Sequence, residues 1–253
     1  MLSVVIPSYK DPLLVKTIDS ILENSESEVE IIAVLDGYWP SFELRQDPRV
    51  RYLHLGKNRG MRGAINAGVA ISRGDYIMRT DEHCSFGKGF DKIILETIQD
   101  NWVVTPRRYF LDPIKWEVMD KPPVDFMKLV IRGNKFCGVE APGNNEPIQE
   151  SQAMQGSCWM MPRKWWDEVI GELQTEGYGP CYQDSHEMVF KTWKAGGKLM
   201  VNKNTWHAHK HRSFPRTHNN GTPENPSNNE ACFVYSLSQW EGYFNELKNE
   251  GKL

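Results

Sequence analysis

Three polar side chains directly follow a short apolar run in this sequence. Asp81, Glu82 and His83 come after the run 76–78, which is typical of a buried β-strand. An aspartate and a histidine two positions apart at a strand end can point to the same side and share one divalent cation. Oxygen and nitrogen ligands without a thiolate suit Mn²⁺ or Mg²⁺, and the imidazole favours Mn²⁺. The alternative is a solvated turn with ordinary acidic residues.

A histidine-rich segment near residue 209 offers a third ligand. His207, His209 and His211 alternate with other residues there. One of them could complete the coordination of a cation held by the 81–83 motif. The alternative is a histidine-rich surface loop.

The elements around these residues indicate an α/β protein. Apolar runs predict strands and 3.6-residue spacing predicts helices, with strands at 2–6, 29–35 and 49–55 and helices at 13–22 and 58–70. The order strand, loop, helix, strand begins a parallel sheet, and ligand sites of such sheets lie at the carboxyl ends of strands, where Asp81 stands. We therefore expect a mixed, mostly parallel central sheet flanked by helices in a single domain.

The second half of the chain has weaker periodicity. Its predicted elements are helices at 91–99, 163–170, 187–194 and 232–247 and strands at 102–106, 155–161 and 199–201. The stretch 107–150, rich in proline and glycine, is predicted to be irregular, and 214–229 is predicted to be a mobile loop.

Composition excludes several classes of protein. The 253 residues are 40% hydrophobic and 25% charged, as in a soluble globular protein, and the net charge of -3 gives no general argument for binding nucleic acid or membrane. Five cysteines without Cys-x-x-Cys spacing argue against a disulfide framework or a structural zinc site and predict a reducing, cytoplasmic compartment. No apolar run is long enough to predict a membrane span.

Several segments together resemble GT-A glycosyltransferases, especially the large family-two group. The opening run 4–9 (Val-Val-Ile-Pro-Ser-Tyr) and the segments 58–68 and 74–77 match that group's first blocks. The Asp-x-His of residues 81–83 stands at the family's Asp-x-Asp motif, in a form similar to that of polypeptide N-acetylgalactosaminyltransferases. The segments 183–197 and 209–212 resemble the later catalytic block and the His-x-x-Arg metal segment. The matches run in the expected order from about residue 3 to about residue 212.

The resemblance implies a set of site residues. The metal ligands are Asp81, His83 and His209. The contacts of a UDP-sugar donor are Pro7, Tyr9, Asp36, Arg62, Thr80, Asp81, Glu82 and Arg212. The catalytic candidates are Asp184 and Glu187. It also implies a nucleotide-sugar-binding half at 1–105, an acceptor and catalytic half at 106–212, and a mobile loop and helix at 213–253 packed on the same domain.

Some of these residues have two interpretations. Tyr9 can stack on uracil or pack in the core, and Arg62 can reach a phosphate or be solvated. Asp184 can be a helix N-cap or the general base of an inverting enzyme, but Gln183 replaces the acid that usually precedes it. The features shared with N-acetylgalactosaminyltransferases indicate retention instead, so the stereochemistry stays open. Glu187 can hold the acceptor or pair with Lys191.

The function that follows is metal-dependent transfer of a sugar, a hexose or N-acetylhexosamine, from a UDP-sugar to an acceptor hydroxyl. A glycan or protein is the expected acceptor, and the basic and aromatic residues of 203–216 also suit a hydroxylated base in nucleic acid. The alternatives are a nucleotidyltransferase acting on a sugar phosphate, whose Gly-rich signature the loop 8–14 lacks, and a non-catalytic sugar- or nucleic-acid-binding module.

Overall fold

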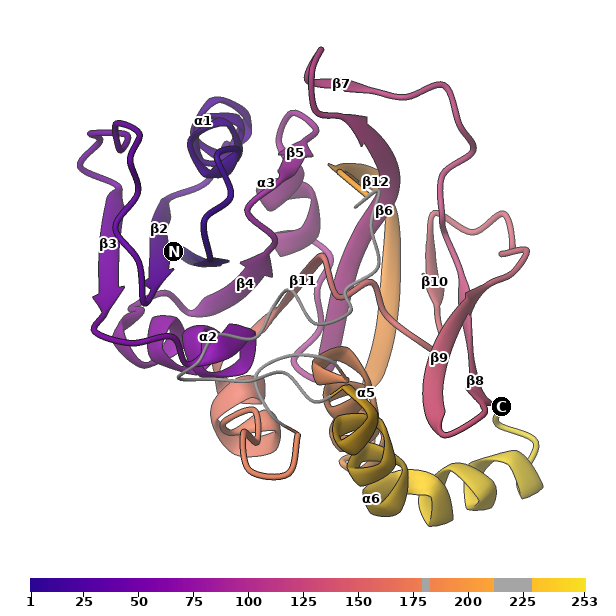
Figure 1. Cartoon of the computed structure of the whole chain (residues 1–253). Helices are drawn as coiled ribbons and strands as arrows, with labels where there is room; N and C mark the ends of the chain where they lie inside the picture. The colour runs from indigo at the N-terminus through magenta and orange to yellow at the C-terminus, as the bar shows by residue number, and fades with distance from the viewer. Residues whose placement is uncertain (179–182, 212–228) are drawn as a thin grey trace.

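The protein is built around one twisted sheet with helices on both faces. A computed structural model describes residues 1–178, 183–211 and 229–253. Within these residues the sheet has ten strands in the order β10-β12-β6-β11-β4-β1-β2-β3, with β5 paired to β12 and β7 paired to β6. Figure 1 shows this sheet with α1 above it and α2, α5 and α6 below it.

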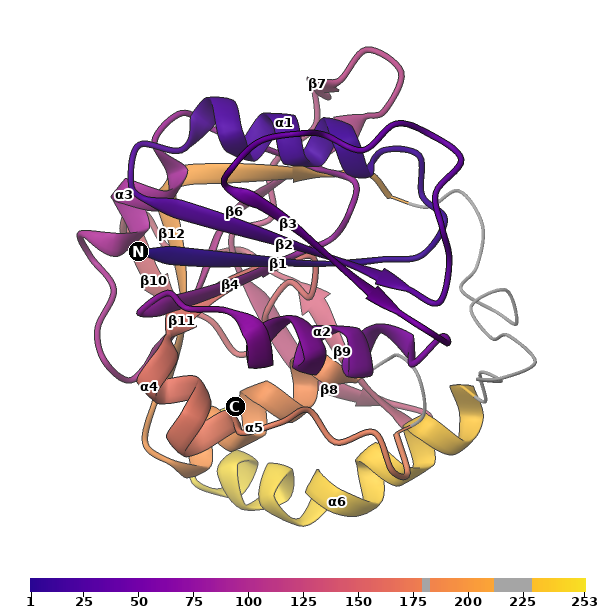
Figure 2. The same ribbon diagram turned by 90° about the vertical axis from the view of Figure 1, so that its left-hand side faces the viewer.

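The first half forms the parallel part of the sheet, as the sequence predicts. The strands β1 (Leu2–Ser8), β2 (Val29–Asp36), β3 (Val50–Leu55) and β4 (Tyr76–Thr80) pair in parallel. The helices α1 (Leu14–Asn24) and α2 (Gly60–Ile71) connect them and lie on opposite faces (Figure 2). The lack of a side chain at Gly68 lets α2 approach β1 and β2 closely, because a Cβ there would meet Val5 and Val34.

The central strands β1 and β2 are mostly apolar, because both of their faces are covered. In β1, Val4 and Ile6 pack on the side of α1, whereas Val5 packs on the side of α2. Such double burial is typical of parallel sheets.

The second half adds the mixed part of the sheet. Its strands are β5 (Cys84–Phe86), β6 (Trp102–Asp112), β11 (Cys158–Pro162) and β12 (Lys198–His209). Strand β11 runs antiparallel to β4, whereas β12 runs parallel to β6. The helices are α3 (Phe90–Leu95), α4 (Arg163–Trp165), a π-turn η1 (Trp166–Ile170), α5 (Asp184–Lys194) and α6 (Asn229–Asn249).

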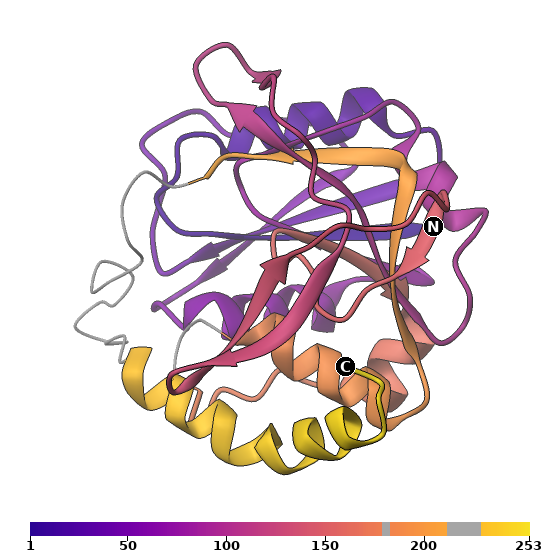
Figure 3. The ribbon, with the colours of Figure 1, turned by 90° about the vertical axis from the view of Figure 1, so that its right-hand side faces the viewer.

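The prediction of irregular structure for 107–150 is wrong. This stretch contains the end of β6 and the strands β7 (Glu117–Val118), β8 (Met127–Arg132), β9 (Lys135–Glu140) and β10 (Ile148–Glu150). The prolines lie between the strands, and β8 and β9 form a hairpin through the two-residue turn Gly133-Asn134, with Gly133 at φ 61°. The hairpin lies outside the main sheet, and β9 contacts α6 (Figure 3).

Two further boundaries differ from the predicted ones. Strand β12 has 12 residues rather than three, because it pairs with β6 along nearly its whole length. The predicted mobile loop 214–229 lies almost wholly outside the described residues, and Asn229 begins α6. Helix α6 packs on α5, with the rings of Trp240 and Phe190 stacked at 5.2 Å. No helix within the described parts of the chain is long and apolar enough to cross a membrane.

Candidate active site

The sheet brings together the two histidine-containing segments that the sequence singled out. Strand β4 ends at Thr80, and β5 begins at Cys84, so Asp81 and His83 lie in the short connection between them. Strand β5 pairs antiparallel with the end of β12, which places His209 opposite Cys84. This strand pairing makes neighbours of His83 and His209, which are 126 positions apart in the sequence.

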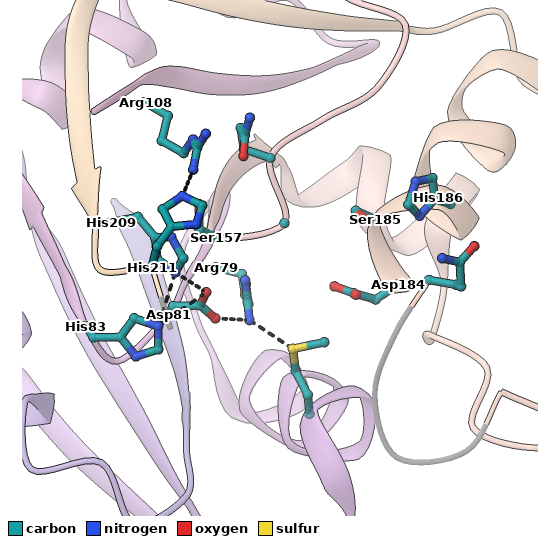
Figure 4. Close-up of a pocket in the computed structure, with 14 residues that line it drawn as sticks. Arg79, Asp81, His83, Arg108, Ser157, Asp184, Ser185, His186, His209 and His211 are labelled. Atoms are coloured by element: carbon teal, nitrogen blue, oxygen red, sulfur yellow. Dashed lines mark hydrogen bonds and ion pairs between the residues drawn. The ribbon is translucent and has the colours of Figure 1, made fainter. Parts of the chain in front are cut away.

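Three potential ligand atoms converge at this point. His209 Nε2 lies 3.1 Å from Asp81 Oδ2, and His83 Nε2 lies 3.9 Å from the same oxygen. The two Nε2 atoms are 3.1 Å apart. All three residues are buried, and their ligand atoms lie within 4.8 Å of one another. Figure 4 shows the three side chains pointing toward one another.

The protonation states of Asp81 and His209 suit a divalent cation. Burial lowers the pKa of His209 to about 4, so its imidazole is neutral at physiological pH. Burial by itself would raise the pKa of Asp81, but the positive charge of Arg79 holds it well below its usual range. A neutral imidazole and an ionised carboxylate are the forms that bind metal ions. One carboxylate and two imidazoles fit Mn²⁺ or a similar divalent ion.

A buried arginine lies against Asp81, the aspartate of the cluster. Arg79 lies in β4 and is 1% exposed, and its Nη2 lies 2.5 Å from Asp81 Oδ1 and 3.0 Å from Met61 Sδ. Arg79 is not among the site residues expected from the sequence. The sequence feature that could have identified Arg79 is its charge within a mostly apolar strand, because a buried guanidinium requires an anionic partner.

The cluster forms one wall of a pocket of about 400 Å³. The lining residues come from α2, β4, β6, β12, α5 and the segments next to these elements and to β11. They are Met61, Arg79, Asp81, His83, Arg108, Gln155, Gly156, Ser157, Gln183, Asp184, Ser185, His186, His209 and His211. In Figure 4 His83, His209 and His211 lie on one side of the pocket, and the start of α5 with Asp184 and His186 lies on the other. A pocket of this volume can hold a small ligand.

Asp184 occupies the wall opposite the cluster. It is the first residue of α5, and the N-cap position belongs to Gln183, which makes no side-chain capping hydrogen bond. Asp184 is 5% exposed, and its Oδ2 has no hydrogen-bond partner among the described residues. The geometry therefore does not support the N-cap interpretation and leaves this oxygen available to a ligand. Burial lowers the pKa of the neighbouring His186 to about 4.

The remaining histidines of the segment differ in their environment. His207 is buried, and its Nε2 lies 3.0 Å from Ser157 Oγ rather than near Asp81. His211 lines the pocket and hydrogen-bonds to Arg108, which also pairs with Glu140 at 2.8 Å. Of the three candidates, His209 is the one grouped with Asp81 and His83. Arg212 lies outside the described residues.

Glu82 and Thr80 lie next to the cluster but hydrogen-bond to the backbone of neighbouring segments instead of lining the pocket. The Glu82 carboxylate accepts the backbone N–H of Tyr9, with N···O distances of 3.2 and 3.1 Å, and burial raises its pKa to about 8. Thr80 is fully buried and donates to the Ser157 carbonyl at 3.2 Å. Pro7 lies within β1 and is also absent from the pocket lining. Direct contacts of these residues with a nucleotide stay predictions.

The other residues predicted to contact the donor lie near the ends of β1 and β2. Asp36 is buried and accepts from Asn58 Nδ2 at 3.0 Å and from Arg59 N at 2.7 Å, and burial raises its pKa to about 6. It thereby holds the start of α2. The half-buried Tyr9 ring packs edge-on against Tyr38 with centroids 5.9 Å apart. Their contacts with a base or ribose stay predictions.

Arg62 and Glu187 pair with each other instead of lining the pocket. Both side chains are buried and form an ion pair, and the Arg62 guanidinium lies 3.9 Å from the centroid of the Tyr178 ring. Glu187 also pairs with Lys191 at 2.8 Å, which was its alternative role. The arrangement favours a structural role for both residues. Their predicted roles toward phosphate and acceptor are untested.

The fold and the site together point to glycosyl transfer, and comparison with known proteins agrees. Residues 3–170 match the family described as Glycosyl transferase family 2. This match covers well over half of the sequence. The chain therefore belongs to glycosyl transferase family 2.

Individual relatives agree with this family but are longer. Polypeptide N-acetylgalactosaminyltransferase 12 of Mus musculus is 25% identical over 268 residues, covering 97% of this chain and 44% of the relative. Uncharacterized glycosyltransferase EpsJ of Bacillus subtilis (strain 168) is 36% identical over 84 residues, covering 30% of this chain and 24% of the relative. The chain thus spans less than half the length of these curated relatives.

A solved structure shares the architecture. The crystal structure of GalNAc-T7 with UDP, GalNAc and Mn²⁺ matches with a TM-score of 0.75 and 16% identity, covering 97% of this chain and 50% of that chain. The predicted GT-A fold is therefore confirmed.

Proposed function

We propose that this glycosyltransferase moves a hexose or N-acetylhexosamine from a UDP-sugar to an acceptor hydroxyl and depends on a divalent cation. The observation that carries the proposal is the convergence of Asp81, His83 and His209 on one wall of a pocket whose opposite wall carries Asp184. A cation held by the first three residues would neutralise the donor diphosphate and stabilise the departing UDP. Mn²⁺ and UDP in the GalNAc-T7 structure support the same choice of ion and nucleotide.

The opposite wall is suited to the acceptor. Asp184 offers an oxygen without a partner among the described residues, at the start of a helix that holds its backbone in place. Such an oxygen can accept the proton of an incoming hydroxyl, or orient that hydroxyl if no base is required. The acceptor is a glycan or a protein, or a hydroxylated base in a nucleic acid, and the exposed mouth of the pocket must contact the rest of it.

Release of UDP from a panel of UDP-sugars tests this function. We expect the wild-type protein to release UDP from at least one of UDP-glucose, UDP-galactose and their N-acetylamino counterparts when Mn²⁺ is present, and to stop when EDTA removes the ion. GDP-mannose serves as the control donor. Equal release with EDTA, or no release from any UDP-sugar with every acceptor class supplied, would contradict the proposal. Formation of pyrophosphate from UTP and a sugar phosphate would indicate the nucleotidyltransferase alternative instead.

A further inference from the structure

The two ring nitrogens of His83 face different partners. Nε2 points toward Asp81 and His209, while Nδ1 lies 3.0 Å from Oδ2 of Asp11, in the loop after β1. We propose that Asp11 is a positioning residue, which holds His83 in the tautomer that presents the Nε2 lone pair to the cation. This inference rests on the proposed metal dependence and adds a residue to it that sequence reasoning missed.

The position of the Asp11 carboxylate is fixed from its other side. Its Oδ1 accepts the backbone N–H of Leu13 at 2.9 Å, at the entrance to α1. The Asp11 side chain is only 15% exposed. The second oxygen is thereby directed at His83 by a local turn, without help from the metal cluster.

The chemistry of a carboxylate then determines the tautomer of the ring. An ionised carboxylate only accepts hydrogen bonds, so the Nδ1 that contacts Asp11 must carry a hydrogen. In a neutral imidazole the other nitrogen then has a free lone pair, and that nitrogen is the Nε2 that faces the cluster. A carboxylate behind a histidine ligand also orients the ring and increases its basicity.

Glu82 also lies close to His83 but is less suited to this role. Asp11, Glu82 and His83 form a second group of neighbouring polar atoms. The Glu82 carboxylate already accepts the Tyr9 N–H with both oxygens. The His83 backbone is held separately, because its carbonyl accepts the Lys210 N–H at 3.1 Å. Asp11 is therefore the side chain that sets the state of the His83 ring.

The change Asp11→Asn tests this role with little change of shape. The amide oxygen can still accept the Leu13 N–H, but the amide nitrogen now donates toward Nδ1 of His83. His83 must then accept at Nδ1 and carry its hydrogen on Nε2, which faces the cation. We expect Mn²⁺ affinity, measured by electron paramagnetic resonance and calorimetry with UDP present, to fall by about 10- to 100-fold.

A matched control is Asp112→Asn. Asp112 accepts the backbone N–H of Ile114 at 2.9 Å in a turn of the same kind, and it is not part of the pocket lining. This variant is expected to bind Mn²⁺ like the wild-type protein. A loss of affinity confined to Asp11→Asn would exclude a general effect of losing one carboxylate.

The tautomer can be observed directly without any metal. Nitrogen-15 NMR of the metal-free wild-type protein at mildly alkaline pH should show His83 with its hydrogen on Nδ1, and Asp11→Asn should move it to Nε2. A hydrogen on Nε2 in the wild-type protein would overturn the inference even if the variant failed to fold. Unchanged Mn²⁺ affinity in Asp11→Asn would overturn the inference and leave the metal site intact. Failure of the wild-type protein to bind Mn²⁺ would overturn the metal site itself and this inference with it.

Discussion

Asp81→Asn is expected to lower the rate of UDP release by at least about 10³-fold, even at saturating Mn²⁺. The substitution removes the single carboxylate from a cluster otherwise made of His83 and His209. Loss of such a ligand corresponds to about 4 kcal/mol of transition-state stabilisation, since each tenfold change in rate is about 1.4 kcal/mol. Turnover measured across a range of Mn²⁺ concentrations checks this.

The same substitution should also destabilise the fold, because Arg79 would lose its anionic partner. The guanidinium is almost completely buried beside Asp81, and leaving a buried charge unpaired costs about 3–5 kcal/mol. The double variant Asp81→Asn, Arg79→Met removes that charge and is expected to regain stability in chemical denaturation. It should not regain activity. Near-wild-type turnover of Asp81→Asn would show that the cluster is not the metal site.

Asp184→Asn is expected to lower turnover by roughly 10²–10⁴-fold while UDP and Mn²⁺ binding stay intact. The reason is the position of Asp184, which lines the pocket across from the cluster, where an acceptor hydroxyl would arrive. Its Oδ2 has no hydrogen-bond partner among the residues that the structure describes. Stability should change little, because Gln183 and not Asp184 occupies the N-cap position of α5. The measurements are kcat, acceptor KM and the anomeric configuration of the product.

Asp167→Asn is a suitable control for that experiment. Asp167 also lies in the first turn of a helical segment, but its side chain is 55% exposed and it is not part of the pocket lining. We expect wild-type turnover from this control. If Asp184→Asn also turned over at the wild-type rate, Asp184 would have no role in proton transfer. A retaining product with a loss mainly in acceptor KM would indicate that Asp184 binds the hydroxyl without acting as a base.

The position of Asp81 and His83 was predictable because both residues lie at strand ends. The apolar run before Asp81 predicts a buried strand, and parallel strands place their carboxyl ends at the ligand-binding edge. The position of His209 cannot be predicted from the local sequence, because only the pairing of β12 with β5 brings this residue next to His83. Its selection rested on the family resemblance, and the sequence spacing alone could not distinguish it from His207 and His211.

The partners of the cluster were not predictable in the same way. Asp11 precedes a helix like many turn-forming aspartates, and its contact with His83 spans 72 positions. Arg108, which lines the same pocket, lies in a stretch that was predicted to be irregular and is in fact the end of β6. Strand pairing decides the structure of that stretch, and its local composition carries little of this information.

Two residues that were predicted to contact the UDP-sugar contact other residues of the protein instead. Asp36 is the last residue of β2, where a nucleotide-binding acid is expected, yet its carboxylate accepts from Asn58 and Arg59 at the start of α2. Arg62 lies on the expected helix, but it points to Glu187 of α5. The sequence indicates which helix carries a charge, whereas the direction of the side chain depends on helices that pack against it.

Calorimetry of the wild-type protein with UDP tests whether this pocket binds the nucleotide through a divalent cation. We expect UDP to bind at least about tenfold more tightly with Mn²⁺ than with EDTA. The reason is that the cation offsets the electrostatic repulsion between the negative diphosphate and the Asp81 carboxylate. UDP should also bind more tightly than GDP or CMP. Equal affinity for UDP with and without Mn²⁺, or tighter binding of GDP, would contradict the account.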